Sequence, residues 1–141
     1  MATATPATIP LLHRFLAIGL VMLAAVLVGL RHLTLTPMLP DDNVPQLVAY
    51  AMSGLSLALA AVAYFILKPG VPERPPGQSV ADFWSTPEVA TKAMSVWFCL
   101  EGAGTISAAG YYLTGEPVCA LAAVLGIVAF WSCGPNVFAK A

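Results

Sequence analysis

One acidic side chain lies deep inside an apolar stretch of this sequence. Between Lys92 and Glu116 the only charged residue is Glu101. If Glu88 to Leu113 forms one helix, its rise of about 1.5 Å per residue puts this carboxyl roughly 20 Å from one end and roughly 18 Å from the other. A hydrocarbon core is about 30 Å thick, so Glu101 is expected near its midplane. Ionisable groups at that depth are costly and are candidates for function.

The chemistry open to Glu101 depends on its partners. No basic residue of the chain is expected at its depth, so we predict a protonated, hydrogen-bonded carboxyl. Such a group could exchange a proton or a cation, or it could bond a serine or a carbonyl and fix the register of two helices. Ser53 and Ser56, at similar depth in the preceding apolar stretch, are the expected donors. Thr105 shares the helical face of Glu101, and Ser107 lies on an adjoining face.

Small residues surround Glu101 on several sides of its helix. In membranes, small side chains let helix backbones approach closely and hydroxyls bond across the contact. We therefore expect this helix to be central and to touch more than one neighbour. The residues predicted to mediate this packing are Gly102, Gly104, Ala108 and Gly110.

The remaining chemistry-bearing residues do not form a recognisable site. His13 and His32 would lie about 28 Å apart on one helix, so they cannot share a haem or a metal ion. Each is expected to be a polar anchor at the membrane interface, although each could offer one ligand to a pigment or haem shared with a partner.

Cys99, Cys119 and Cys133 form no CxxC motif, so we predict neither an internal disulfide nor a thiolate metal site. No nucleophile, base and orienting group occur together. The sequence predicts no enzyme activity, no cofactor and no metal.

The amino-acid composition indicates whether the chain is surrounded by water or by lipid. The chain of 141 residues is 59% hydrophobic and only 9% charged, with a mean hydropathy of +0.83. Soluble domains carry about 25% charged residues, so this chain could not cover a surface that faces water. Its net charge of −1 offers no electrostatic footprint for nucleic acid. The composition predicts an all-α membrane protein.

Four apolar stretches are predicted to be membrane helices, of which the fourth is a little short. Turn-forming residues separate them, and we expect them to form one domain of two antiparallel hairpins, with a mobile tail at residues 1–10 and a Pro-rich connector at 68–86. The predicted spans are about 11–33, 46–67, 87–113 and 117–133.

Local signals define the last two spans best. Pro87 and Pro117 suit the first turn of a helix, and Gly115 suits the left-handed residue that ends one. So short a connection predicts antiparallel neighbours. The first span lacks charge from Phe15 to Leu30, which is longer than the roughly 7–15 apolar residues of a signal peptide, so we expect it to be retained.

Basic residues predict the orientation. Positive charges favour the cytoplasmic side of membrane proteins. Five of them would lie on one side, at Arg14, Lys68, Arg74, Lys92 and Lys140, against Arg31 on the other. Both termini and the connector are therefore expected in the cytoplasm, and the loop with Asp41 and Asp42 outside. Aromatic residues expected at the inner interface are Tyr64, Phe65, Trp84 and Trp131, with residues 80–84 as an interfacial segment.

The segment from Glu101 to Gly115, EGAGTISAAGYYLTG, resembles the carboxylate helix of the proteolipid (c-type) subunits of rotary ATP synthases. The resemblance lies in a mid-membrane carboxylate, a small residue (here Ser107) six positions later, and aliphatic residues to the helix end. It is also similar to small uncharacterised bacterial four-helix membrane proteins. Those proteolipids carry the carboxylate on the second helix of a hairpin, whereas Glu101 is on the first helix of its pair. The resemblance implies that Glu101 carries an ion.

Three functions remain open at this point. The first is a non-catalytic accessory or structural subunit of a larger complex in the bacterial cytoplasmic membrane, in contact with lipid and with other membrane subunits or further copies of itself. The second is a proteolipid-like protein that translocates protons or cations, with Glu101 as the carrier. The third is a binder of lipid or another hydrophobic ligand, lined by Trp97 and Phe98.

Overall fold

A computed structural model describes residues 8–34, 39 and 43–140, and this part of the chain contains helices and no strand. Residues 1–7 and the pair Asp41 and Asp42 lie outside the described residues. The elements are α1 (Thr8–Leu33), α2 (Val44–Ala61), a π-helical segment (Val62–Leu67), a 3-10 turn (Lys68–Gly70), α3 (Val80–Ser85), α4 (Pro87–Thr114), α5 (Pro117–Ser132) and α6 (Pro135–Phe138).

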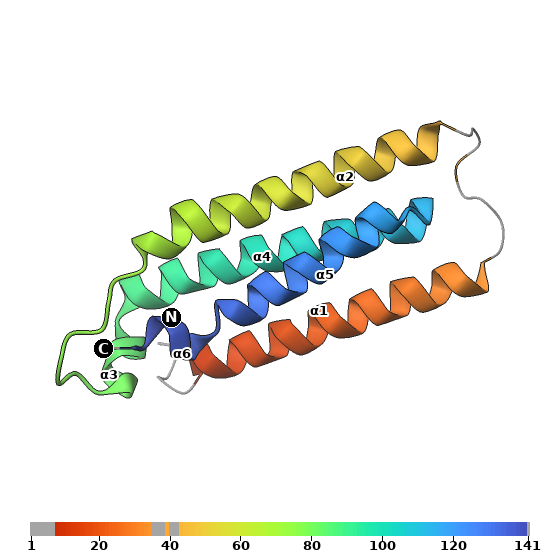
Figure 1. Cartoon of the computed structure of the whole chain (residues 1–141). Coiled ribbons are helices and arrows are strands. Elements are labelled where there is room, and N and C mark those ends of the chain that lie inside the picture. The colour runs from red at the N-terminus through yellow and green to blue at the C-terminus, as the bar shows by residue number, and fades with distance from the viewer. Residues whose placement is uncertain (1–7, 35–38, 40–42, 141) are drawn as a thin grey trace.

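The four long helices lie side by side as a bundle (Figure 1). α4 and α5 form an antiparallel hairpin, and α1 and α2 flank it, each in contact with α4. We call the end that holds α3, α6 and residues 71–79 the connector end. The other end, where α4 turns into α5, is the hairpin end. The start of α1 lies at the connector end, so α1 runs parallel to α4, and α2 runs parallel to α5.

The predicted helix boundaries agree closely with the structure. Pro87 and Pro117 occupy the first turns of α4 and α5, as expected. Gly115 ends α4 with φ of +72°, and its amide donates to the carbonyl of Tyr111 at 2.7 Å. Because a left-handed residue turns the chain back at once, α4 and α5 are antiparallel neighbours. α1 begins at Thr8, earlier than predicted, because Ile9 is buried in the core.

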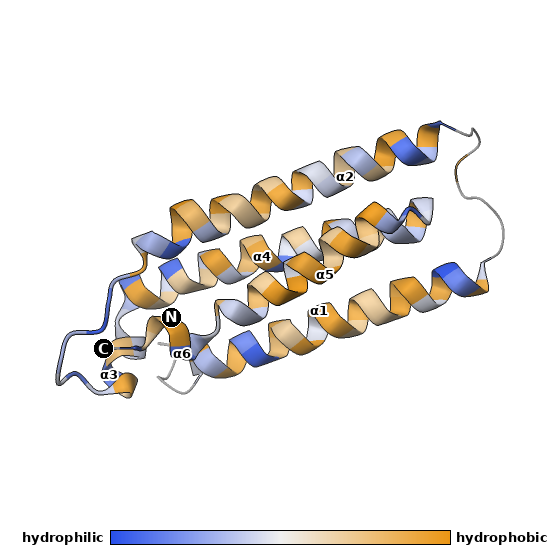
Figure 2. Cartoon of the chain, in the orientation of Figure 1, coloured by the Kyte–Doolittle hydropathy of each residue, from blue (hydrophilic) through white to orange (hydrophobic). Residues whose placement is uncertain are grey.

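Two helices among the described residues are long and apolar enough to cross a membrane. They are Thr8–Leu33, of 26 residues, and Val44–Gly70, of 27 residues. α5 is apolar but has only 16 residues. Apolar residues dominate the long helices, and polar residues gather in the connector (Figure 2). The described part of the chain is therefore all-helical, and two of its helices are both long and apolar enough to cross a membrane.

α4 is the central helix, as its small residues predicted, because it packs against α1, α2 and α5. A Cβ atom built on Gly126 of α5 would lie 3.1 Å from the Cα atom of Gly104, so these two backbones touch. A Cβ atom on Gly104 would itself lie 2.9 Å from Leu20 of α1, and one on Gly110 would lie 3.2 Å from Met52 of α2. Glycine is required where helices approach this closely.

The last part of the connector, predicted as an interfacial segment at residues 80–84, forms a short helix. Residues 80–85 form α3, which begins with Ser79 accepting a hydrogen bond from the amide of Asp82 at 3.0 Å. Phe83 and Trp84 are buried within the protein, so Trp84 packs inside the protein at this end of the bundle. These side chains pack at the connector end with Trp97, and burial of aromatic surface explains why α3 folds back onto the bundle.

The Gly104–Gly126 contact predicts different outcomes for two Gly→Ala substitutions. Gly126→Ala should lower the free energy of unfolding by about 1–3 kcal/mol, because the new methyl group meets the backbone of α4. Gly54→Ala is the control, since nothing lies within 4 Å of a Cβ atom there. We expect Gly54→Ala to be as stable as the wild type or more so. Thermal unfolding in mild detergent measures both, and equal loss from the two variants would contradict the contact.

Candidate functional site

Glu101 lies near the centre of the 28-residue helix α4 and is half-buried. At about 1.5 Å per residue, its Cα atom is about 20 Å from each end of the helix. The position of Glu101 near the middle of its helix therefore agrees with the position predicted from the sequence.

The side of α4 on which Glu101 lies follows from its neighbours in the helix. Gly104, three residues later, faces Leu20 of α1. Residues three apart lie on the same side of a helix, so Glu101 is on the α1 side of α4. Ala103 is on a different side, because its carbonyl accepts a hydrogen bond from Ser56 of α2 at 2.7 Å.

The two serines of α2 do not bond Glu101, and this expectation was wrong. The Ser56 hydroxyl donates to Ala103, and the Ser53 hydroxyl donates to the Cys119 Sγ atom at 3.4 Å. Both serines are buried between α2, α4 and α5. Ser56 lies near the level of Glu101, but it meets α4 on the side away from that carboxyl. Ser53 lies nearer the hairpin end, because its partner Cys119 is next to Gly110.

Glu101 has no hydrogen-bond donor and no ion-pair partner among the residues that the structure describes. The one ion pair within the same residues joins Lys92 to Glu88 at 2.7 Å, near the connector end of α4. A carboxyl near the middle of the longest helix thus has no partner in the described part of its own chain.

One side of α4 is not covered by α1, α2 or α5. Its residues recur at helical spacings of three and four, and we call them the open face of α4: Thr91, Ser95, Phe98, Gly102, Thr105, Ile106 and Ala109. The first three are exposed and the others are half-buried. A Cβ atom on Gly102 would have nothing within 4 Å. Glu101 borders this face, and Thr105, one turn later, lies beside it.

Ser107 lies on another side of α4, fully buried, and its hydroxyl has no partner among the described residues. Hydroxyls in helices usually bond the carbonyl four residues earlier. Thr114 does so, donating to Gly110 at 2.7 Å. For Ser107 that carbonyl belongs to Ala103, where Ser56 already donates. Of the proposed polar partners, only Thr105 therefore accompanies Glu101.

His13 is a core residue, not the interfacial anchor predicted for it. It is 5% exposed, and its ring stacks on Phe130 with 4.6 Å between centroids and meets Trp97 edge-on at 4.9 Å. Its Nε2 atom lies 3.4 Å from the carbonyl oxygen of Phe130. The signal missed in the sequence was helical spacing, since His13 shares the buried face of α1 with Ile9 and Ala17.

The other candidate ligands are dispersed. His32 is exposed, with its ring 6.5 Å from that of Tyr111. In the described part of the chain, no three His, Cys, Asp or Glu side chains lie close enough to hold a metal ion. Trp97 is fully buried, and its indole donates to the carbonyl of Cys133 at 2.7 Å, whereas Phe98 is 54% exposed. Trp97 and Phe98 therefore do not line one ligand site.

Comparisons with protein-family models, with curated proteins and with solved structures gave no match. The function of the site has to follow from its own geometry and chemistry.

The hydroxyl arrangement predicts opposite outcomes for two Ser→Ala substitutions. Ser56→Ala should lower stability by about 0.6 kcal/mol and by no more than about 1.7 kcal/mol, the average and the maximum for hydrogen bonds between membrane helices. Ser107→Ala should leave stability unchanged or raise it, because no bond is lost and a buried unpartnered hydroxyl is removed. Unfolding in mixed micelles compares the two, and a larger loss from Ser107→Ala would show that its hydroxyl is bonded after all.

Proposed function

We propose that this chain is a non-catalytic accessory subunit of a larger membrane assembly, which it joins through the open face of α4. The observation that carries the proposal is the half-buried carboxyl of Glu101, which borders this face and receives no hydrogen bond from any residue that the structure describes. In the assembly, a donor on a partner helix bonds this carboxyl. The partner is another membrane subunit or a second copy of the chain.

The energetics favour a partner at this position. An ionised group at the centre of a membrane helix costs about 2.5–3.5 kcal/mol on insertion scales, and a neutral carboxyl still requires hydrogen bonds in hydrocarbon. A partner's donor would supply them. Gly102 and Ala109, two turns apart on the open face, would let its backbone come close, while Phe98 and Ile106 provide apolar contact.

We propose that all four long helices span the membrane, in the cytoplasmic membrane of a bacterium, with both chain termini and the connector in the cytoplasm. Support comes from the lengthwise packing of α4 and α5 against the two helices of membrane-spanning length. The charges agree with the positive-inside rule. The connector end holds Arg14, Lys68, Arg74, Lys92 and Lys140, and Arg31 lies at the hairpin end.

Filling the open face tests the assembly directly. Gly102→Leu should abolish co-purification of the partner in mild detergent, because the larger side chain blocks its approach. Gly54→Leu, on α2, is the matched control, since a Cβ atom at either position has nothing within 4 Å. Both variants should fold like the wild type. Retention of the same partner by Gly102→Leu, or absence of any partner or oligomer from the wild type, would contradict the proposal.

The same carboxyl supports a second candidate function, in which Glu101 carries a proton or cation across the membrane. An unpartnered carboxyl at mid-depth, beside an uncovered helix face, is free to exchange its proton when a charge or water approaches. The resemblance to the proteolipid carboxylate helix adds to this candidate.

A flux measurement separates the two functions. In liposomes, the wild-type chain should dissipate a pH gradient if Glu101 is the carrier, and Glu101→Gln should not. Glu88→Gln makes the same change at an exposed position and should keep the flux. Equal leak from the wild type and Glu101→Gln would exclude carriage by this residue. Glu101→Gln should keep the partner in either case, because the amide still forms hydrogen bonds.

A further inference from the structure

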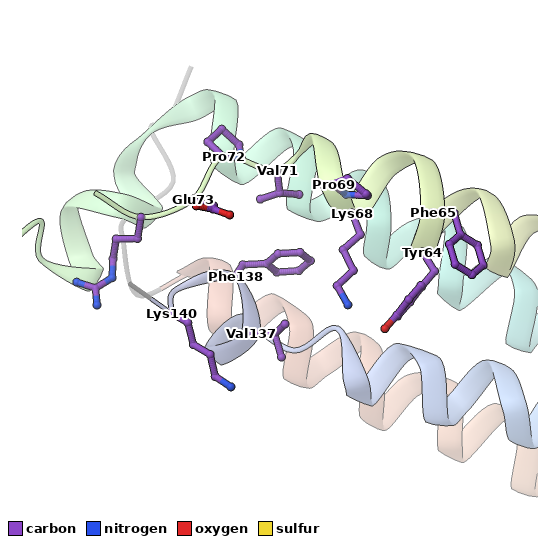
Figure 3. A pocket seen from close by; sticks show the side chains of 11 residues that line it. Tyr64, Phe65, Lys68, Pro69, Val71, Pro72, Glu73, Val137, Phe138 and Lys140 are labelled. Carbon is purple, nitrogen blue, oxygen red and sulfur yellow. The ribbon is translucent and has the colours of Figure 1, made fainter. Parts of the chain in front are cut away.

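A second unassigned feature is a pocket of about 680 Å³ at the connector end, between the end of α2 and α6. Figure 3 shows Tyr64 and Lys68 on one side and Phe138 on the other, with Glu73 and Lys140 farther out. Three basic side chains and one acidic side chain line it, so its charge is net positive. The pocket is far from Glu101 along the bundle and takes no part in the open face of α4.

Lys68 is the group available to a ligand. Its Nζ atom lies 3.9 Å from the centroid of the Tyr64 ring and points into the space between Tyr64 and Phe138 (Figure 3). No carboxylate among the described residues forms an ion pair with it. An ammonium that stands over an aromatic ring without a counterion retains hydrogen-bond donors for an anion.

Arg74 plays a different part, because its guanidinium is already engaged. Its Nε atom donates to the carbonyl of Ala139 at 2.8 Å, and it also donates to the carbonyl of Gln78. These bonds join the connector to the end of the chain. They fix the outer wall of the pocket and leave the positive charge of Arg74 beside it.

An apolar groove of about 320 Å³ continues from this pocket between α2 and α5. Tyr64 and Phe65 line both cavities. Small residues such as Ala60 and Ala129 keep the groove open. Tyr64 and Phe65 belong to the π-helical segment, and such segments are rare and occur often at functional sites.

We propose that the pocket and the groove together bind one anionic phospholipid. The Lys68 ammonium donates to the phosphate, Lys140 adds to the positive field, and an acyl chain lies in the groove between α2 and α5. The inference rests on the proposed topology, which puts the connector end at the cytoplasmic interface, and is independent of Glu101 and its partner. A basic group near an anionic leaflet is attracted to it electrostatically. The absence of a counterion for Lys68 among the described residues favours an anionic headgroup over a zwitterionic one.

Native mass spectrometry of the full chain in mild detergent tests the headgroup. Phosphatidylglycerol should remain bound to the wild type, whereas phosphatidylcholine should bind at least about tenfold more weakly, a difference of about 1.4 kcal/mol. Lys68→Gln should remove this preference. Lys92→Gln makes the same change at the same end but outside the pocket, and it should bind like the wild type. Equal binding of the two lipids by the wild type would overturn the proposal.

Two further binding experiments test whether an acyl chain lies in the groove and whether the bound phosphate belongs to a lipid or to a soluble molecule. Ala60→Phe fills the groove and should weaken phosphatidylglycerol binding while Lys68 stays in place. Soluble glycerol phosphate should not displace the lipid at comparable concentration, and displacement would assign the pocket to a soluble phosphate ligand instead. Gly102→Leu should keep the lipid, and Lys68→Gln should keep the protein partner, so failure of one proposal is distinguishable from failure of the other.

Discussion

The contact between the backbones of α4 and α5 at Gly104 and Gly126 is the constraint on which the rest of the bundle depends. With no side chain between them, the two helices approach to van der Waals distance. Leu20 of α1 then fits against Gly104 on one side, and Met52 of α2 fits against Gly110 on another. Without a hydrophobic driving force between helices in lipid, dispersion contacts of this kind and a few hydrogen bonds hold such a bundle together.

This packing explains why the polar groups of α4 have different surroundings. The side that faces α2 and α5 holds small side chains and buried hydroxyls, and Ser56 satisfies a backbone carbonyl there. Ser107, equally buried, has no acceptor among the described residues. Glu101 lies toward α1 at the margin of the bundle. The described helices do not cover it completely, and it is therefore accessible to another molecule. A buried hydroxyl can stay unpartnered at modest cost, but a carboxyl in hydrocarbon cannot. The same fold therefore encloses Ser107 completely and leaves Glu101 half-buried at the edge of the bundle, where we propose that a partner meets it.

The sequence predicted the boundaries of the helices well, but it did not predict how each helix is rotated about its own axis. Pro87, Pro117 and Gly115 act through local backbone chemistry, so the limits of α4 and α5 were within reach of the sequence alone. The central place of α4 also followed from its small residues. Depth along a helix is likewise a matter of counting, and Glu101 and Ser56 are indeed near the same level. Which sides of two helices face each other depends on every contact in the bundle. The sequence alone does not give this, and the predicted hydrogen bond between Ser56 and Glu101 was therefore wrong. His13 and α3 were missed for a related reason, because their burial comes from residues far away in the sequence, such as Phe130 and Trp97.

The central position of α4 also has a consequence for biosynthesis. α1 and α2 each pack chiefly on α4, yet the ribosome makes both of them first. Until the third long helix emerges, His13 on α1 and Ser53 on α2 have none of the protein surfaces that later enclose them. α1 and α2 can therefore gain most of their packing surface only after α4 and α5 have been made. α4 and α5, in the second half of the chain, thus provide the surface against which α1 and α2 pack.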